Sequence, residues 1–411
     1  MQDIVILGGA QTDFARHWAR EGRDLFAMFA DVVHAALEDA GLSAGDIGVG
    51  HVGTFTAELF AHQGLTGGFF PHVDPGFDGM PSARHEAACA SGSVAVLAAM
   101  ADLEAGRFET ALVVGIELMR NVPGKVATDH IGCAAWAGRE AVGAPFVWPR
   151  IFSELAEEVN HRHGLNWRHL AEISRIAFEN ARRNPLAHTR DWDMSGSRLA
   201  PDDAANPVID GWLRRSDCAQ LSDGAAAIVL ATPKRAVDIA RRQGRDPERL
   251  ARIRGWGWRT APLLFEAKLA ASRGQDVILP HMAGAIADAF RRAGVPGVEC
   301  VDVIETHDCF SITHYLAIEA FGITPPGQAW QAIEHGRIAA GGDIPMNVGG
   351  GLIGGGHPVG ATGVRMLLDA ARQVEGRAGP MQVEGARTAA TFNMGGSGTM
   401  NCAFVVGAGT V

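Results

Sequence analysis

Tyrosine and long apolar runs are what this sequence has least of. Of its 411 residues one is tyrosine and 52 are glycine, so many tight turns and close backbone approaches are expected. No apolar run reaches about 18 residues, so we expect no membrane-spanning helix. The start, MQDIVILGG, lacks a basic segment and a long apolar segment, which indicates a first β-strand and not a signal peptide.

An excess of positive charge and closely paired cysteines are also missing. The net charge is -10, and this argues against a nucleic-acid partner, since nucleic-acid binders carry basic faces. None of the six cysteines forms a C-x-x-C pair, which argues against a zinc ribbon. Free thiols favour a reducing compartment, and we expect the protein in the cytoplasm.

The order of predicted elements indicates an α/β fold in two halves. A chain of this length outgrows one hydrophobic core, so two core-forming units are expected. DIVILGG predicts a buried strand, and the helical pattern after it closes at Gly41, which together favour a largely parallel sheet. Residues from about 119 to 215 interrupt the alternation of predicted strands and helices, and this predicts an inserted loop subdomain. We therefore expect an N-terminal half at 1–235 and a C-terminal half at 236–411.

The second half repeats a pattern of the first. RHEAACASGSVAVL, around Cys89, predicts a strand end, a turn and a helix. CVDVIETHDCFSITHYL, around Cys309, predicts the same order. The parallel suggests two similar halves, each of which presents a cysteine at a strand-to-helix turn.

Cys89 is a candidate nucleophile. A helix start directs free N–H groups and the positive end of the helix dipole outward, so the pKa of a thiol there can fall well below about 8.5. The small neighbours of Cys89 leave room for a substrate carbonyl. The alternative is a buried cysteine that acts as a small apolar residue.

His357 is a candidate partner for that thiol. It lies in NVGGGLIGGGHPVGATG, which formally contains the dinucleotide fingerprint Gly349-x-Gly351-x-x-Gly354. The residues before it do not read as a strand, so we favour a flexible loop that carries His357 and starts a helix near Ala361. An imidazole raises the thiolate fraction of a cysteine. The alternative is a structural loop histidine.

Two further segments could supply polar groups to a site. In HDCF, His307 and Cys309 are two residues apart on an extended turn, so both could face one cavity; alternatively Asp308 caps a helix. In TFNMGGSGTMNCAFVV, two predicted strands flank a glycine-rich loop that begins near Gly395. Its N–H groups could bind an oxyanion, although a plain hairpin turn explains the pattern as well.

In this order the segments resemble the thiolase superfamily over nearly the whole chain. GGAQTDFAR is similar to the family's opening strand, CASG to its nucleophile turn and SDGAAA to a signature at the end of its first half. GGGHPVGATG is similar to the family's GHPxGATG loop and is the most specific element. The resemblance implies two α/β halves packed in five layers, αβαβα, with an inserted loop domain.

Two departures from the common pattern resemble the sterol-carrier type of thiolase. HDCF at 307–310 stands where common thiolases have NEAF, and NMG at 393–395 replaces a Cys-x-Gly loop. In the sterol-carrier type the HDCF cysteine takes over the acid/base role. Gly355 stands where the family often has lysine before GHP, which puts some coenzyme contacts in question.

The resemblance assigns a role to each candidate. It implies that Cys89 accepts the acyl group and that His357 activates it. Cys309 would act as acid and base on the second substrate, and His307 would bind the thioester oxygen. Backbone N–H groups of Cys89 and Gly395 would form the oxyanion hole, and no metal is implied.

The resemblance also implies substrates and partners. Expected substrates are coenzyme A thioesters, such as acetyl-CoA, which form or release 3-ketoacyl-CoA without a further cofactor. Thiolases are usually homodimers or homotetramers, and some sterol-carrier relatives work beside a small OB-fold partner. The other class of function is a coenzyme A or lipid-binding subunit, or a retro-aldolase that cleaves a steroid side-chain thioester.

Overall fold

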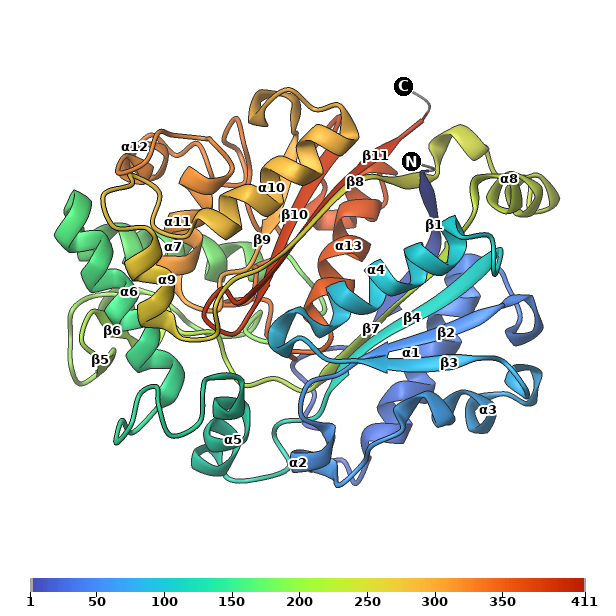
Figure 1. Ribbon diagram of the computed structural model, residues 1–411, viewed down its shortest axis with the longest axis horizontal. Helices are drawn as coiled ribbons and strands as arrows, with labels where there is room; N and C mark the ends of the chain where they lie inside the picture. The colour runs from blue at the N-terminus through green and yellow to red at the C-terminus, as the bar shows by residue number, and fades with distance from the viewer. Residues whose placement is uncertain (1–2, 410–411) are drawn as a thin grey trace.

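Two sets of strands build the main sheet of the protein, whose computed structural model describes residues 3–409. The first half contributes β1 (Ile4–Gln11), β2 (Val49–Gly53), β3 (Ser82–His85), β4 (Thr110–Glu117) and β7 (Gly224–Ala231). The second half contributes β8 (Ala251–Thr260), β9 (Val303–Thr306), β10 (Thr388–Gly395) and β11 (Met400–Ala408). The strand order is β3-β2-β4-β7-β1-β8-β11-β10-β9, so β1 and β8 join the halves (Figure 1).

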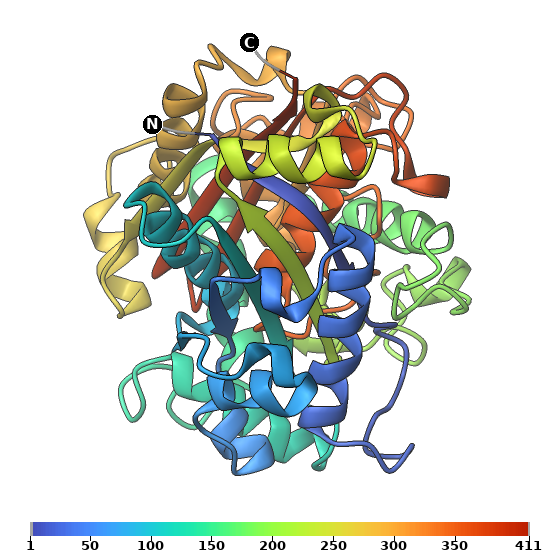
Figure 2. The same ribbon diagram turned by 90° about the vertical axis from the view of Figure 1, so that its right-hand side faces the viewer.

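Helices cover the outer face of each set of strands, and α4 and α13 pack between the two sets. The first half contributes α1 (Leu25–Ala40), α2 (Ala57–Ala61), α3 (Phe70–Val73) and α4 (Ser91–Glu104). Between β4 and β7 lie α5 (Gly124–Ile131), α6 (Val147–His163), α7 (Trp167–Ala181), β5 (Val208–Asp210) and β6 (Leu213–Arg214). The remaining helices are α8 (Pro233–Arg242), α9 (Phe265–Ala271), α10 (Pro280–Ala293), α11 (Ser311–Ala320), α12 (Ala329–Glu334) and α13 (Thr362–Val374). Figure 2 shows α1 and α8 in front of the first-half strands.

Alternating residues of the strands divide between separate apolar cores. In β1, Val5 and Leu7 pack with α1, whereas Ile4 and Ile6 share a core with α4 and α13. A third core joins α10 and α11 to second-half strands, with Phe392 among its buried members. The order is therefore helix, strand, helix, strand, helix, which confirms the five layers.

Small residues let the two central helices approach each other at their N-termini. A Cβ added to Gly92 in α4 would lie 2.6 Å from the Gly360 oxygen, and one added to Gly363 in α13 would lie 2.1 Å from Ser93 Oγ. Larger side chains would push the helices apart. The close contact matters for function because Cys89 and His357 each lie just before one of these helices.

The expected largely parallel sheet was wrong. Within the main sheet, β2 pairs in parallel with β3 and β4, and β9 with β10, whereas the other five pairings are antiparallel. The reversals arise where β10 returns as β11 through a hairpin and where the long insert brings β7 back antiparallel to β4. Local strand and helix patterns do not reveal the direction in which a strand returns.

The topology supports two similar halves but changes which residues correspond. The strand order of the second half mirrors that of the first, so β8–α10–β9 matches β1–α1–β2, and α13 matches α4. Cys89 therefore corresponds in position to His357. Cys309 follows β9, where the first half has the turn after β2. The match of Cys89 with Cys309 was wrong because it compared local patterns and not places in the sheet.

The insert expected at about 119–215 packs on the second half. Phe152 of α6 and Ile173 of α7 share a core with Tyr315 of α11, to the left in Figure 1. The boundary expected between 235 and 236 falls inside α8 and stays a prediction. No helix in the described range 3–409 is long and apolar enough to cross a membrane.

Candidate active site

A strained turn presents Cys89 at the start of α4. Ala88, the preceding residue, has a φ of +52°, which is uncommon for a residue with a Cβ. The Ser91 hydroxyl donates to the Ala88 oxygen at 2.6 Å and accepts from the Ala87 N–H at 2.9 Å. These two hydrogen bonds fix the turn and hence the direction of the thiol.

Three loops that are far apart in the sequence meet at one small cavity. Its volume is about 80 Å³, and Cys89, Cys309 and His357 all line it. The rest of the lining is largely apolar and includes Phe55, Met119, Ile131, Trp148, Phe152, Phe310 and Val359. The predicted convergence of two thiols and an imidazole is therefore present in the structure.

His357 is held so that one ring nitrogen is free. The Thr362 hydroxyl donates to the Pro358 oxygen at 3.1 Å, so it accepts a hydrogen bond from His357 Nδ1 at 2.7 Å. The proton is thereby placed on Nδ1, and Nε2 keeps its lone pair. His357 Nε2 is buried and has no partner within residues 3–409, so it is available as a base.

The loop that carries His357 is buried and tightly packed, whereas a flexible loop was expected. Residues 344–371 are all buried. The segment after α7 holds the loop from outside, because the His188 N–H donates to the Gly355 oxygen at 2.9 Å and the Asn184 amide to the Gly349 oxygen at 2.9 Å. The glycines allow this close packing, since a Cβ on Gly354 would lie 2.4 Å from the Ala177 oxygen.

His307 lies beside His357 with the opposite tautomer. The rings meet edge to face with their centroids 5.1 Å apart. Ser93 Oγ donates to Asn393 Oδ1 at 2.8 Å, which leaves the Asn393 amide to donate to His307 Nδ1 at 2.9 Å. The neutral ring then carries its proton on Nε2 and can donate to a substrate oxygen.

Cys309 lies at the turn between β9 and α11. Burial, and next the neighbouring Cys89, raise the pKa of its thiol well above the ordinary value. The alternative in which Asp308 caps the helix was wrong. The residue before α11 is Phe310, and Asp308 accepts from the Leu352 N–H at 2.6 Å, so it ties this turn to the His357 loop.

The expectation of a low pKa at Cys89 was also wrong for the free protein. Burial raises the pKa of the thiol to about 12, although a hydrogen bond from the Gly396 backbone opposes the shift. Loss of hydration in the apolar cavity outweighs the helix start. Cys89 is therefore a thiol at rest and needs a base to become a nucleophile.

The backbone group that faces Cys89 belongs to Gly396, one residue beyond the predicted Gly395. Gly396 lines the cavity and hydrogen-bonds to the thiol. Gly395 packs on the nucleophile turn, where an added Cβ would lie 2.0 Å from the Ala87 oxygen. The sequence located the hairpin, but its register against Cys89 depends on how β10 pairs with its neighbours.

Glu117, at the end of β4, is a site residue that the sequence reasoning missed. Its carboxylate accepts from the Phe55 N–H at 2.9 Å, the Thr56 N–H at 3.1 Å and the Gly360 N–H at 3.2 Å. It thus joins a wall of the cavity to the His357 loop. An acid at the end of the apolar strand ALVVGIE was the signal that could have found it.

Buried carboxyls and imidazoles predict that stability falls above about pH 6.5. Burial raises the pKa of Glu117 to about 7 and of Asp308 to about 8, so folding binds these protons more tightly and stability is lost as pH rises from the ordinary to the raised pKa. Burial lowers the pKa of His314 and His357 to about 3, so these two groups add stability as pH rises to about 6.5 and offset the loss below that pH. The loss that is not offset is expected between about pH 6.5 and 8.

Urea unfolding midpoints at a series of pH values check this prediction. Asp308→Asn is expected to flatten the fall on the alkaline side because the titrating carboxyl is gone. A wild-type midpoint that climbs steadily between about pH 6.5 and 8.5 would contradict it.

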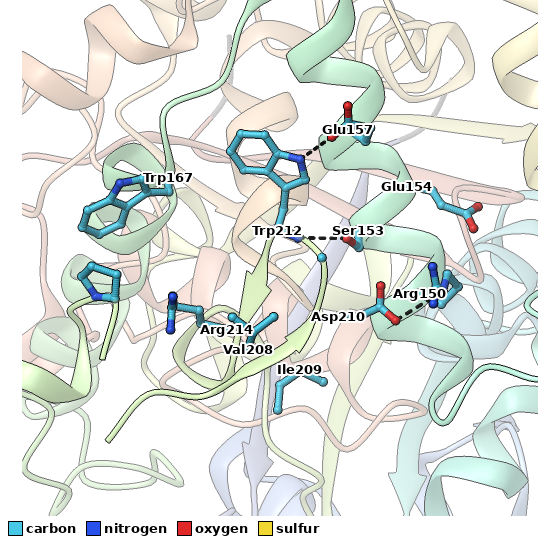
Figure 3. Close-up of a pocket in the computed structure, with 12 residues that line it drawn as sticks. Arg150, Ser153, Glu154, Glu157, Trp167, Val208, Ile209, Asp210, Trp212 and Arg214 are labelled. Carbon is cyan, nitrogen blue, oxygen red and sulfur yellow. Dashed lines mark hydrogen bonds and ion pairs between the residues drawn. The ribbon is translucent and has the colours of Figure 1, made fainter. Parts of the chain in front are cut away.

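A larger hollow, of about 760 Å³, lies on the other face of α6 (Figure 3). Ser153 and Glu157 of α6 face it and bind Trp212, whose N–H donates to Ser153 Oγ at 3.0 Å and whose indole N–H donates to Glu157 at 2.5 Å. Its lining, within the described residues, includes no thiol or imidazole. The cavity at Cys89 is therefore the better candidate for an active site.

One group of side chains in the described residues could hold a metal ion. The ligand atoms of Cys89, His307 and His357 all lie within 4.8 Å of one another. A thiolate and two imidazoles match the ligands of Zn²⁺. The hydrogen bonds of Asn393, however, place the proton of His307 on Nε2, so His307 is a hydrogen-bond donor toward the site. The absence of a metal stays a prediction from the sequence.

The fold and the site define a five-layered α/β protein in which two thiols and one imidazole line a cavity and a second imidazole lies beside them. Residues 4–175 match the thiolase N-terminal domain, and residues 266–408 match the thiolase C-terminal domain-like family. The chain is 32% identical to Acetyl-CoA acetyltransferase of Methanothermobacter thermautotrophicus, over 97% of each chain. It is 26% identical to Sterol carrier protein 2 of Homo sapiens, over 97% of this chain and 71% of that protein. The chain belongs to the thiolase family.

Solved structures confirm the fold over its full length. A chain described as Ltp2-ChsH2(DUF35) aldolase superposes with a TM-score of 0.79 and 20% identity, covering 99% of this chain and 98% of that chain. Acetyl-CoA acetyltransferase from Syntrophomonas wolfei superposes with a TM-score of 0.70 and 18% identity, covering 99% of both chains. At these identities the likeness concerns the fold alone.

Proposed function

We propose that the protein is an acyl-CoA C-acyltransferase, a thiolase, that works through an acyl-enzyme on Cys89. One observation carries the proposal: Cys89, Cys309 and His357 line a single cavity. The relatives named Acetyl-CoA acetyltransferase, at 30% and 32% identity, support it. A volume of about 80 Å³, against the roughly 10–15 Å³ that one water needs on the same measure, leaves room for a short acyl group such as acetyl.

The first half-reaction forms the acyl-enzyme. His357 Nε2 takes the proton of Cys89 as the sulfur attacks the thioester carbonyl. The oxyanion accepts hydrogen bonds from the N–H groups of Gly396 and Cys89; each such donor typically contributes about 10²–10³ in rate. The C–S bond to coenzyme A then breaks, and the released thiolate takes the proton from His357.

The second half-reaction makes the carbon–carbon bond. His357 Nε2 takes the proton of Cys309, whose sulfur then removes an α-proton from a second thioester, and His307 donates from Nε2 to the enolate oxygen. The carbanion attacks the acyl carbon, the C–S bond to Cys89 breaks to give a 3-ketoacyl-CoA, and the released Cys89 thiolate takes the proton from His357. The reverse sequence is thiolysis. The steps need coenzyme A thioesters and no other cofactor.

Mass spectrometry after mixing the protein with acetyl-CoA tests the proposal. The expected result is one acetyl group, located on the peptide that contains Cys89. The other candidate is a thiolase-fold subunit that binds coenzyme A or lipid, or a retro-aldolase, and the aldolase fold neighbour is its support. An unmodified Cys89 under conditions where coenzyme A binds would favour that candidate.

Partners and compartment are part of the proposal. We expect a homodimer or homotetramer, and a small OB-fold partner that helps to bind coenzyme A; co-purification from the native host would detect it. The aldolase neighbour with a DUF35 component supports such a partner. All six cysteines are free, which supports the cytoplasm as compartment.

Asn393→Ala is expected to lower the condensation and thiolysis rates by about 10- to 100-fold. Without the amide donor, His307 Nδ1 is free to take the proton, and Nε2 no longer points a hydrogen at the enolate. Steady-state kinetics should show the loss in kcat with little change in KM. Ser93→Ala keeps the amide and should lose less than about tenfold. Equal losses in both variants would argue against the assigned tautomer.

A further inference from the structure

The hairpin between β10 and β11 carries the backbone N–H group that faces Cys89. Because the hairpin is rich in glycine, its backbone has no strong preference for one conformation. Gly396 and Gly398 have φ values of +62° and +80°, and Gly395 precedes them. Glycine populates many backbone conformations, so this sequence alone does not hold the Gly396 N–H in one direction. An oxyanion donor works only when it is fixed about 3 Å from the oxygen.

Lys268 of α9 holds this hairpin from outside the cavity. Its ammonium donates to Ser397 Oγ at 2.5 Å and to Thr399 Oγ1 at 2.8 Å, on either side of Gly398. A third hydrogen bond reaches the Leu263 oxygen at 3.1 Å. All three N–H groups of the ammonium are therefore used.

A lysine at this place is unusual in two ways. The sequence has three lysines among its 36 basic residues; Lys125 and Lys234 are exposed, whereas Lys268 is 3% exposed. No ion pair of Lys268 is found within residues 3–409, and burial lowers its pKa to about 8. Burying a charge is costly unless hydrogen bonds compensate it. Three separate acceptors match the three N–H donors of an ammonium, whereas the guanidinium of arginine is planar and larger.

The same helix also holds another wall of the cavity. Glu140 accepts from the Phe265 N–H at the start of α9 and from the Trp136 N–H, both at 2.6 Å. Trp136 is two residues after Ala134, which lines the cavity and lies next to Gly396. α9 is thus connected to both segments that meet at Gly396.

We propose that Lys268 is a positioning residue for acyl transfer, which keeps the Gly396 N–H directed at the thioester oxygen. It does not touch the reacting atoms and acts through Ser397 and Thr399. The inference rests on the proposed function, because it concerns the first half-reaction at Cys89.

Two reactions of Cys89 separate this role from a merely structural one. Acetylation by acetyl-CoA needs the oxyanion hole, whereas alkylation by iodoacetamide develops no oxyanion and does not. In Lys268→Met we expect the single-turnover acetylation rate to fall about 10- to 100-fold. The rate of Cys89 alkylation, followed by peptide mass spectrometry, should stay within about twofold of wild type. Lys234→Met is the matched control and should change neither rate.

A second variant keeps the lysine and removes one of its acceptors. Ser397→Ala should slow acetylation several-fold without slowing alkylation. The double variant Lys268→Met/Ser397→Ala should be no slower than Lys268→Met alone, because both changes break the same connection.

The outcomes are distinct. Acetylation at the wild-type rate in Lys268→Met overturns the inference, and so does a parallel fall of acetylation and alkylation, which indicates a collapsed cavity. If the wild-type protein is not acetylated at Cys89 at all, the proposed function fails and the positioning role fails with it.

Discussion

Cys89→Ala is expected to lower thiolysis and condensation by at least about 10⁴-fold. In the proposed mechanism the substitution removes the atom that carries the acyl group, and Cys309, which lines the same cavity from the turn after β9, is assigned to the second half-reaction. The measurement is the coenzyme A-dependent loss of a 3-ketoacyl-CoA, together with mass spectrometry for the acyl-enzyme. No acetylated peptide should remain at position 89.

Cys300→Ala is the control for the loss of a thiol elsewhere. Cys300 is exposed, in the short helical turn Val298–Cys300, so its loss should leave both rates unchanged. Undiminished activity in Cys89→Ala would contradict the acyl-enzyme mechanism as a whole.

Cys309→Ala is expected to separate the two half-reactions. General acid/base groups contribute about 10²–10⁴ in rate, so condensation and thiolysis should fall by that factor. Acetylation of Cys89 should persist, because its proposed base is His357 and its proposed oxyanion donors are backbone groups. Burst kinetics of coenzyme A release report the first half-reaction, and product formation reports the second.

Cys218→Ala removes a thiol near Cys309 and is therefore the control for Cys309→Ala. Cys218 forms a β-bridge with Phe310, and its sulfur hydrogen-bonds to the Arg214 oxygen at 3.4 Å, away from the reacting groups. We expect both half-reactions to survive its loss. If Cys309→Ala instead abolished acetylation, the two thiols would not have the separate roles assigned to them.

Local features of this protein could be read from its sequence with good accuracy. α1 ends at Ala40 and is capped by Gly41, which has a φ of +64°, and α13 begins at Thr362, one residue after the predicted start. The turn before α4 and the β10–β11 hairpin are also where the sequence indicated. These features depend on residue periodicity and on what glycine permits within a few residues, so the sequence carries them directly.

The sequence motifs also identified four side chains of the site. Cys89, Cys309 and His357 line the cavity, and His307 lies beside Cys89 and His357. Their roles remain proposals. Glu117 and Lys268 lie outside the motifs and were missed, because what they contact is distant in the chain. Thr362 lies within the GHPxGATG loop, but nothing in the sequence singled it out as the partner of His357.

What the sequence determined by itself was the set of local elements, the family and the reactive side chains. Only the tertiary structure decided that the sheet is mixed, that Gly396 and not Gly395 faces Cys89, and that the thiol has a raised pKa. The reason is physical. Strand direction, hairpin register and desolvation depend on which distant segments surround a group, and these neighbours are set by strand pairing and by the packing of the two halves.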